Sequence, residues 1–197
     1  MHPLKLTDLA KQLKVPYAGK EVLIHHVSTD TRTIQPGDVF IAINGERFNG
    51  HAYVSDALAK GASAVIVSEP LKTRTSIPHL QVPDTMLALS ELGKQRRMMF
   101  TKPVIGITGS CGKTTVRAMV THILSLTGPV LSPVANFNNE VGVPKTLLEL
   151  TDVHEYAVIE MGATKSGDIA YLMNIVHPDV SLLTNVGSAH LASFGDL

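Results

Sequence analysis

Apolar residues recur along the chain at two spacings, and the alternation between them predicts a mixed α/β fold. Short apolar runs rich in Val and Ile predict buried strands, and stretches with apolar residues three and four positions apart predict helices. In the first half we expect helices at 6–13, 53–60 and 85–99 and strands at 21–27, 39–42, 64–67 and 80–82. In the second half we expect strands at 104–107, 129–131, 156–159 and 180–183 and helices at 113–126, 142–150 and 167–176. Strands and helices that alternate in this way are typical of a largely parallel sheet.

Polar residues and glycine mark the expected helix ends. Thr7 or Asp8 is expected to cap the helix at 6–13, and Asp84 is expected to cap the helix at 85–99. Gly61 is expected to end the helix at 53–60, because glycine readily adopts the left-handed conformation found after helix C-termini. The stretch Thr101-Lys102-Pro103 then interrupts the pattern, which starts again with the strand at 104–107. We therefore expect two domains, at 1–102 and 103–197.

Composition excludes several classes of protein. The chain has 197 residues, with 17 Lys and Arg balanced by 17 Asp and Glu, so no net charge favours nucleic acid as a partner. No apolar run approaches the ~20 residues of a membrane-spanning helix, and the N-terminus does not resemble a secretion signal. The single cysteine cannot form an intrachain disulfide. We expect a cytoplasmic protein that does not insert into membranes.

The stretch 104–115 carries the strongest chemical signal. An apolar strand runs into Gly109-Ser110-Cys111-Gly112, and Lys113-Thr114-Thr115 opens the next helix, as in a phosphate-binding loop. Backbone N–H groups and the helix N-terminus would hold the phosphates, Lys113 would reach their terminal oxygens, and the Thr114 hydroxyl would serve a phosphate-bound Mg²⁺. The generic spacing fails by one residue, because Ile107 stands where it requires glycine. The alternative is a glycine-rich turn without a ligand.

Three further positions follow strands, where ligands bind in sheets of this kind. Glu160 directly follows the strand at 156–159 and could hold Mg²⁺, the alternative being a carboxylate in solvent. Asn185 and His190 follow the strand at 180–183, although a lone histidine is more often structural. The amides within 136–144 precede a helix, so they could cap it or bind an anionic substrate.

Taken together, these motifs resemble the Mur ligases over the whole chain. The stretches that match in order are Ser-Thr-Asp-Thr-Arg at 28–32, Gly-Glu-Arg-Phe-Asn-Gly-His at 45–51, Thr-Gly-Ser-Cys-Gly-Lys-Thr-Thr at 108–115, Asn-Phe-Asn-Asn-Glu-Val-Gly-Val-Pro at 136–144, Val-Ile-Glu-Met-Gly-Ala at 158–163 and Asn-Val-Gly-Ser-Ala-His at 185–190. Asn-Asn-Glu and Glu-Met-Gly-Ala are typical of the member that adds D-alanyl-D-alanine. The resemblance implies a small N-terminal α/β domain that binds a UDP-sugar, followed by a truncated α/β domain of the phosphate-loop type that binds ATP.

The resemblance also implies a reaction. ATP would phosphorylate the carboxylate of UDP-MurNAc-tripeptide, and the amine of D-alanyl-D-alanine would attack the acyl phosphate to form an amide. ATP and Mg²⁺ are the implied cofactors, and the two peptide compounds are the implied partners. The family's whole protein is expected to be monomeric, whereas a truncated sheet could pair with a second copy through its exposed edge.

By the same resemblance, residues receive roles. The expected catalytic residues are Lys113, Glu160 and His190. The expected nucleotide-binding residues are Gly109, Ser110, Cys111, Gly112, Lys113, Thr114 and Thr115. The expected substrate-binding residues are Ser28, Asp30, Arg32, Arg47, Phe48, His51, Asn138 and Asn139. The expected metal ligands are Thr114, Glu160 and His190. For Asp30 and Arg32 the alternative is a surface ion pair of little energetic consequence.

The sequence departs from the family in two respects. Cys111 stands where asparagine is common, and a thiol there, near Lys113 and a helix N-terminus, should ionise more easily than a free one. We expect thiol reagents to inactivate the protein and Mg-ATP to protect it, the alternative being a cysteine that only fills space in the turn. The chain also stops within the expected central domain, so we expect a fragment without ligase turnover by itself. Three alternatives stay open: a general phosphate-loop nucleotidase or kinase, a nucleotide-sensing interaction module, and the sibling Mur ligase that adds the third stem-peptide residue.

Overall fold

The computed structural model describes residues 3–45, 48–71, 76–133 and 137–187. The contacts within the chain divide it into two compact units, His2–Leu92 and Gly93–Leu197. The division falls within helix α3 (Thr85–Met99), whereas the boundary expected from sequence, near residue 102, follows that helix.

The first unit is built on a parallel sheet in the order β3-β4-β7-β8. Its strands are β3 (Val27–Ser28), β4 (Val39–Ile41), β7 (Ala64–Val67) and β8 (His79–Gln81). β4 and β7 are completely buried central strands, which explains their unbroken apolar sequences. Three helical segments accompany the sheet, namely α1 (Leu6–Gln12), the 3-10 helix η1 (Gly50–Tyr53) and α2 (Val54–Ala59). Two small antiparallel pairs complete the unit, one of β1 (Leu4–Lys5) with β2 (Leu23–Ile24) and one of β5 (Asn44–Gly45) with β6 (Phe48–Asn49).

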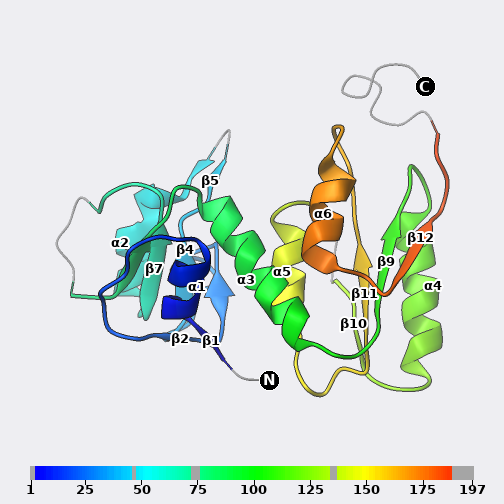
Figure 1. Cartoon of the computed structure of the whole chain (residues 1–197), viewed down its shortest axis with the longest axis horizontal. Coiled ribbons are helices and arrows are strands. Elements are labelled where there is room, and N and C mark those ends of the chain that lie inside the picture. The colour runs from blue at the N-terminus through cyan, green and yellow to red at the C-terminus, as the bar shows by residue number, and fades with distance from the viewer. Residues whose placement is uncertain (1–2, 46–47, 72–75, 134–136, 188–197) are drawn as a thin grey trace. The chain divides into compact units, whose positions relative to one another are not determined.

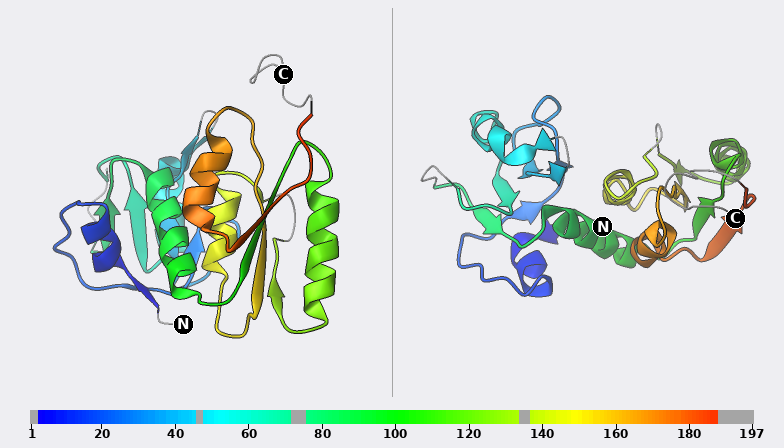
Figure 2. Two further views of the ribbon diagram at one scale, coloured as in Figure 1. Left: turned by 45° about the vertical axis from the view of Figure 1, so that its right-hand side comes forward. Right: turned by 90° about the horizontal axis from the view of Figure 1, so that it is seen from above.

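The second unit is also a parallel sheet, in the order β10-β11-β9-β12. Its strands are β9 (Val104–Thr108), β10 (Val130–Leu131), β11 (Tyr156–Glu160) and β12 (Val180–Leu183), and its helices are α4 (Lys113–Ser125), α5 (Gly142–Leu148) and α6 (Asp168–Val176). Ala157 and Ile159 of β11 pack into one apolar cluster with residues of α5 and α6. Val158, between them, points to the opposite face, where α4 contacts β11. The helices therefore cover both faces, as Figures 1 and 2 show.

These elements confirm the expected mixed α/β fold with mostly parallel sheets. β7 and β12 have the expected bounds, and Asp84 caps α3 by accepting a hydrogen bond from the Met86 N–H group at 2.7 Å. Gly61 has the left-handed conformation (φ +91°) just after α2 and donates to the Leu58 carbonyl. β12 ends the sheet on one side and exposes Val180 and Leu183, so the expected self-association through this edge stays a prediction.

Two expectations about the first unit are wrong. The strand expected at 21–27 is two strands, because β2 pairs antiparallel with β1 whereas β3 pairs parallel with β4. Neither Thr7 nor Asp8 caps α1, which begins at Leu6 after Lys5 without a side-chain cap. The Thr7 hydroxyl instead donates to Glu21 at 2.6 Å, and Asp8 pairs with Lys11. The Thr7 side chain thus contacts a carboxylate distant in the sequence and does not cap the helix.

Candidate functional site

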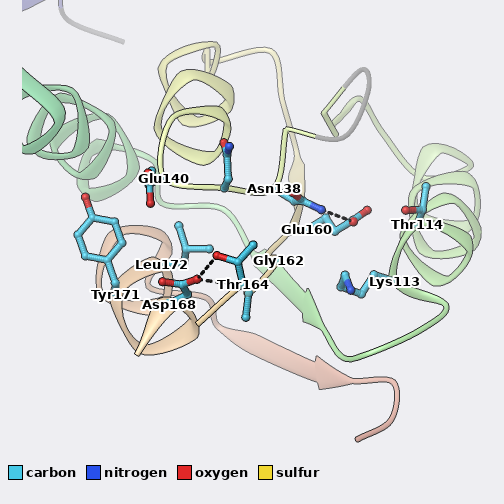
Figure 3. A pocket seen from close by; sticks show the side chains of 12 residues that line it. Lys113, Thr114, Asn138, Glu140, Glu160, Gly162, Thr164, Asp168, Tyr171 and Leu172 are labelled. Carbon is cyan, nitrogen blue, oxygen red and sulfur yellow. Dashed lines mark hydrogen bonds between the residues drawn. The ribbon is translucent and has the colours of Figure 1, made fainter. Parts of the chain in front are cut away.

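A pocket of about 490 Å³ lies in the second unit beside the carboxyl ends of β9 and β11. One end is lined by Lys113 and Thr114 and the middle by Asn138 and Glu160. The other end is lined by the loop after β11 and by Tyr171 of α6. Figure 3 shows these side chains around one cavity, with Lys113 and Thr114 far from Tyr171. The pocket unites groups that sequence reasoning had placed after separate strands.

The phosphate-loop residues form a tight turn between β9 and α4. Gly109 (φ +138°) and Gly112 (φ +81°) adopt backbone conformations that residues with a side chain rarely take. A Cβ atom on Gly109 would lie 2.0 Å from the Thr184 hydroxyl, so the position also lacks space for one. Lys113, Thr114 and Thr115 form the first turn of α4. Because the first N–H groups of a helix lack intrahelical acceptors, this turn offers donors and a partial positive charge to an anion.

The Lys113 ammonium lies over the loop itself. Its Nζ donates to the carbonyl of Gly109 at 2.6 Å and, more weakly, to that of Ser110 at 3.4 Å. The side chain is half-buried and lines the pocket. Phosphate oxygens entering the loop would replace these two neutral acceptors with charged ones, which form stronger hydrogen bonds to an ammonium.

Glu160 is a buried carboxylate, with 2% of the residue exposed. Its Oε1 accepts a hydrogen bond from Asn138 Nδ2 at 2.9 Å, and its Oε2 lies 3.6 Å from Arg117 Nε of α4. Oε2 accepts no hydrogen bond from the residues that the structure describes. Burying an ionised carboxylate is costly unless charge or hydrogen bonds compensate it. The arrangement therefore fits a carboxylate that shares its second oxygen with a cation.

The amides after β10 have separate tasks. Asn139 Oδ1 accepts hydrogen bonds from the N–H groups of Gly142 at 2.8 Å and Val141 at 3.2 Å, so it caps the start of α5. Asn138 instead directs its side chain to Glu160, and its carbonyl accepts from the Gly162 N–H group at 2.7 Å. The capping alternative therefore describes the Asn139 side chain, whereas Asn138 orients Glu160; both residues line the pocket. Whether either contacts a substrate stays a prediction.

Asp168 organises the far end of the pocket. Its Oδ2 accepts hydrogen bonds from the N–H groups of Thr164 (2.8 Å) and Lys165 (3.0 Å) and from the Thr164 hydroxyl (3.0 Å). These bonds, chiefly the one from the Thr164 backbone, lower the pKa of Asp168 because they favour its charged form. Asp168 thus closes the loop between β11 and α6.

Because the pKa of Asp168 is lowered on folding, its charge stabilises the protein above its ordinary value of 3.8 and ceases to do so as the pH falls through the lowered value. We expect Asp168→Ala to lower the free energy of unfolding by about 1 kcal/mol at pH 7, since these are hydrogen bonds to a largely exposed charge. Urea titrations at pH 7 and below pH 3 measure this difference, which should shrink in acid. Asp168→Asn keeps an acceptor oxygen but cannot ionise, so its free energy of unfolding at pH 7 should lie between those of the parent chain and Asp168→Ala. A difference that is the same at both pH values would contradict the assignment.

In the first unit, the expected ligand residues contact one another. The Ser28 hydroxyl, buried, donates to the Asp30 carbonyl at 2.9 Å and shapes the turn after β3. Asp30 binds Arg32 through both carboxylate oxygens, with Arg32 Nη2 at 2.6 Å. The Arg32 side chain is 87% exposed, so this pair has the geometry of a surface ion pair, which contributes little to stability. Its donors face solvent, where a ligand can reach them.

His51 is a structural support in this state. Its Nδ1 lies 2.8 Å from Asn49 Oδ1, and its Nε2 accepts a hydrogen bond from the Ser68 N–H group at 2.9 Å. The ring therefore joins the start of η1 to the residue that follows β7. Phe48 lies in β6, and its side chain is outside what the structure describes, as are Arg47 and His190 altogether. The expected roles of these four residues stay predictions.

Sequence reasoning missed Arg117 and Asp168. Arg117 lies one helical turn after Lys113 on α4, a spacing that places two residues on the same helix face and could have indicated it. Asp168 carried no comparable signal. Among the described residues no group of three or more His, Cys, Asp or Glu side chains could hold a metal ion, and none of the helices is both long and apolar enough to span a membrane.

Comparison with protein families matches both units. A Mur ligase family catalytic domain matches residues 23–97, and a Mur ligase middle domain matches residues 107–197. Together these models cover most of the chain.

Individual relatives agree with this result. The chain is 42% identical, over its whole length, to a UDP-N-acetylmuramoyl-tripeptide–D-alanyl-D-alanine ligase of Escherichia coli strain K12, of which it covers 43%. A crystal structure of MurF from Acinetobacter baumannii matches the whole chain with a TM-score of 0.88 and 40% identity, over 44% of that protein. A MurF ligase from Thermotoga maritima, solved in complex with ADP, matches 84% of the chain with a TM-score of 0.77 and 37% identity, over 38% of that protein. The chain thus spans about two fifths of the length of the curated relatives it matches.

Proposed function

Because the chain belongs to the Mur ligase family, we propose that it is the N-terminal part of an ATP-dependent ligase that joins D-alanyl-D-alanine to UDP-MurNAc-tripeptide. The observation that carries the proposal is the buried Glu160 carboxylate in the same pocket as Lys113 of the phosphate loop. Its Oε2 lies 3.6 Å from Arg117 Nε and accepts no hydrogen bond from the described residues. Glu160 and Lys113 together provide what phosphoryl transfer to a carboxylate requires, namely positioned phosphates and neutralised charge. The Escherichia coli relative described above, whose name states this reaction, supports the choice of substrates.

In this proposal the reaction forms a C–N bond through an acyl phosphate. The loop and the first turn of α4 hold the phosphates of ATP, and Lys113 leaves its two carbonyl partners to bind the terminal phosphate. The product is the completed cytoplasmic precursor of peptidoglycan, which places the protein in cell wall biogenesis. The ADP bound to the Thermotoga relative supports ATP as the nucleotide.

Mg²⁺ fits the same pocket. Glu160 offers a buried carboxylate oxygen without a hydrogen-bond donor among the described residues, and Thr114 offers a hydroxyl at the start of α4. Mg²⁺ is usually held by one or two carboxylates together with substrate phosphates, so a dedicated cluster of protein ligands is not required. When bound, the metal would neutralise charge on the phosphates. Asn138, which donates to Oε1, and Arg117, which lies beside Oε2, would hold the Glu160 carboxylate in position.

The first unit is proposed to bind the UDP-sugar part of the substrate. Arg32 presents a planar set of donors to solvent, and such donors suit the two oxygens of a phosphate. Asp30 holds the guanidinium in place through both of its oxygens. The turn that Ser28 shapes therefore presents an oriented cation after the carboxyl end of β3.

We expect Arg32→Ala to weaken binding of UDP-MurNAc-tripeptide about tenfold, because one charge-assisted contact is worth about 1.4 kcal/mol. Isothermal titration calorimetry of the 197-residue chain measures this, with UDP-MurNAc titrated separately to locate the contact in the UDP-sugar. Lys11→Ala is the control, since Lys11 also belongs to an exposed ion pair of this unit, with Asp8. Equal affinities of the parent chain and Arg32→Ala would contradict this assignment.

The alternatives make different predictions in the same titrations. A general phosphate-loop nucleotidase would bind ATP but no UDP-MurNAc compound. The sibling ligase would bind the UDP-MurNAc-dipeptide in preference to the tripeptide. The D-alanyl-D-alanine ligase requires the tripeptide, so titrations with ATP, the dipeptide and the tripeptide together separate all three.

A further inference from the structure

Residues 184–187, which follow β12 and are called here the Thr184–Gly187 segment, form hydrogen bonds with the phosphate loop. The Asn185 side chain meets both polar groups of the Cys111 backbone, because its Oδ1 accepts from the Cys111 N–H group at 3.0 Å and its Nδ2 donates to the Cys111 carbonyl at 3.1 Å. The Asn185 carbonyl accepts from the Ser110 N–H group at 3.0 Å. These partners lie 74 residues apart in the sequence.

Neighbouring residues strengthen the same contact. The Thr184 hydroxyl also donates to the Cys111 carbonyl, at 2.6 Å. The Ser110 hydroxyl accepts from the Gly187 N–H group at 2.9 Å and donates to the Gly187 carbonyl at 3.1 Å. The Thr184–Gly187 segment is itself continued from the sheet, since the Thr184 N–H group donates to the Thr108 carbonyl at 2.9 Å. The segment therefore fixes the position of the phosphate loop relative to the sheet.

This contact decides which loop donors can reach a phosphate. The N–H groups of Ser110 and Cys111 are directed to Asn185 rather than to the pocket. Gly112 (φ +81°) then leads into α4, whose first residues, Lys113 and Thr114, line the pocket. Asn185 is not among the residues that line the pocket, so it acts on the ligand through the loop.

We infer that Asn185 is a positioning residue, which fixes the Cys111 peptide so that the loop has its phosphate-binding shape before a nucleotide arrives. The inference rests on the proposed nucleotide binding. Asparagine suits the task because its amide offers a donor and an acceptor together, as both Cys111 groups require. A pre-formed loop does not have to be ordered when the nucleotide binds, which favours affinity.

The inference predicts a local and a functional effect of Asn185→Ala. The Cys111 amide loses its acceptor, so its hydrogen exchange should accelerate at least tenfold, while amides of β9 and β11 keep the rates of the parent chain. Affinity for Mg-ATP should fall about tenfold. Asn185→Asp keeps the acceptor oxygen, so it should restore slow exchange at Cys111. Asn174→Ala is the control, because Asn174 is an exposed amide on α6 whose Oδ1 accepts a hydrogen bond from Lys94 Nζ at 3.3 Å.

Hydrogen exchange by NMR or mass spectrometry and calorimetry with Mg-ATP give outcomes that separate the two proposals. Failure of the parent chain to bind Mg-ATP would count against the proposed function, while the exchange rates would still test the contact. Parent-like exchange at Cys111 in Asn185→Ala would overturn the inference. Faster exchange with unchanged Mg-ATP affinity would also overturn it, because the contact would then be structural only. If Asn185→Ala does not fold, Asn185→Asp should still bind Mg-ATP more weakly than the parent while protecting Cys111.

Discussion

Lys113→Ala should bind Mg-ATP at least about a hundredfold more weakly than the parent chain, a loss of about 2.7 kcal/mol. The physical reason is that the ammonium is the one side-chain cation at the loop end of the pocket within the part of the chain that the structure describes. Among the described residues it donates to the Gly109 and Ser110 carbonyls, which compete weakly with phosphate. Calorimetry with Mg-ATP measures the change.

Two variants make this test specific. Lys113→Arg keeps the charge but not the compact, flexible ammonium, so it should recover part of the affinity. Lys102→Ala is the control, because Lys102 belongs to an exposed ion pair with Glu155 outside the pocket. A Lys113→Ala chain that is folded by circular dichroism and binds Mg-ATP like the parent would remove the loop from the proposed site.

Local patterns predicted the fold well wherever one pattern had one structural solution. The buried strands β4 and β7 were predictable because an unbroken apolar run of that length fits only the interior of a sheet. The stretch 21–27 was not, because its residues divide between an antiparallel and a parallel pair, and that choice depends on β1 and β4. The predicted cap of α1 was wrong for the same reason, because the Thr7 hydroxyl donates to Glu21, a residue distant in the sequence.

The candidate site shows the same division. Lys113 and Glu160 could be predicted because parallel strands bring their carboxyl ends to one edge, whatever the chain between them does. The hydrogen bonds that orient them could not. The ion pair of Arg117 with Glu160 and the hydrogen bonds of Asn185 with Cys111 join segments that are distant in sequence. The sequence thus indicates which residues lie near the site, whereas the contacts by which Arg117 and Asn185 hold it in place emerge only from the tertiary structure.

The largest expected effect on stability is at Arg97, in the last turn of α3. The residue is 8% exposed, yet its guanidinium donates to three backbone carbonyls, those of Phe100 (2.8 Å), Val176 (2.8 Å) and His177 (2.7 Å). It also pairs with Asp179 at 3.0 Å, just before β12. Burial lowers the pKa of Arg97 and the Asp179 charge opposes this shift, while arginine stays charged at any physiological pH. One side chain thus satisfies the carbonyl ends of two helices within the second unit.

Arg97→Met, which keeps the apolar stem and removes the donors, should lower the free energy of unfolding by about 3 kcal/mol, because buried carbonyls are left without partners. Urea unfolding followed by circular dichroism measures this difference. The free energy of unfolding of Arg97→Lys should lie between those of the parent chain and Arg97→Met, since an ammonium cannot reproduce the planar set of donors of the guanidinium. Lys94→Met, on the same helix, removes an exposed hydrogen bond of 3.3 Å to Asn174 and should change stability by less than about 0.5 kcal/mol. If Arg97→Met proved as stable as Lys94→Met, the three carbonyls would have other donors. The proposed role of Arg97 in joining the two helix ends to the start of β12 would then be wrong.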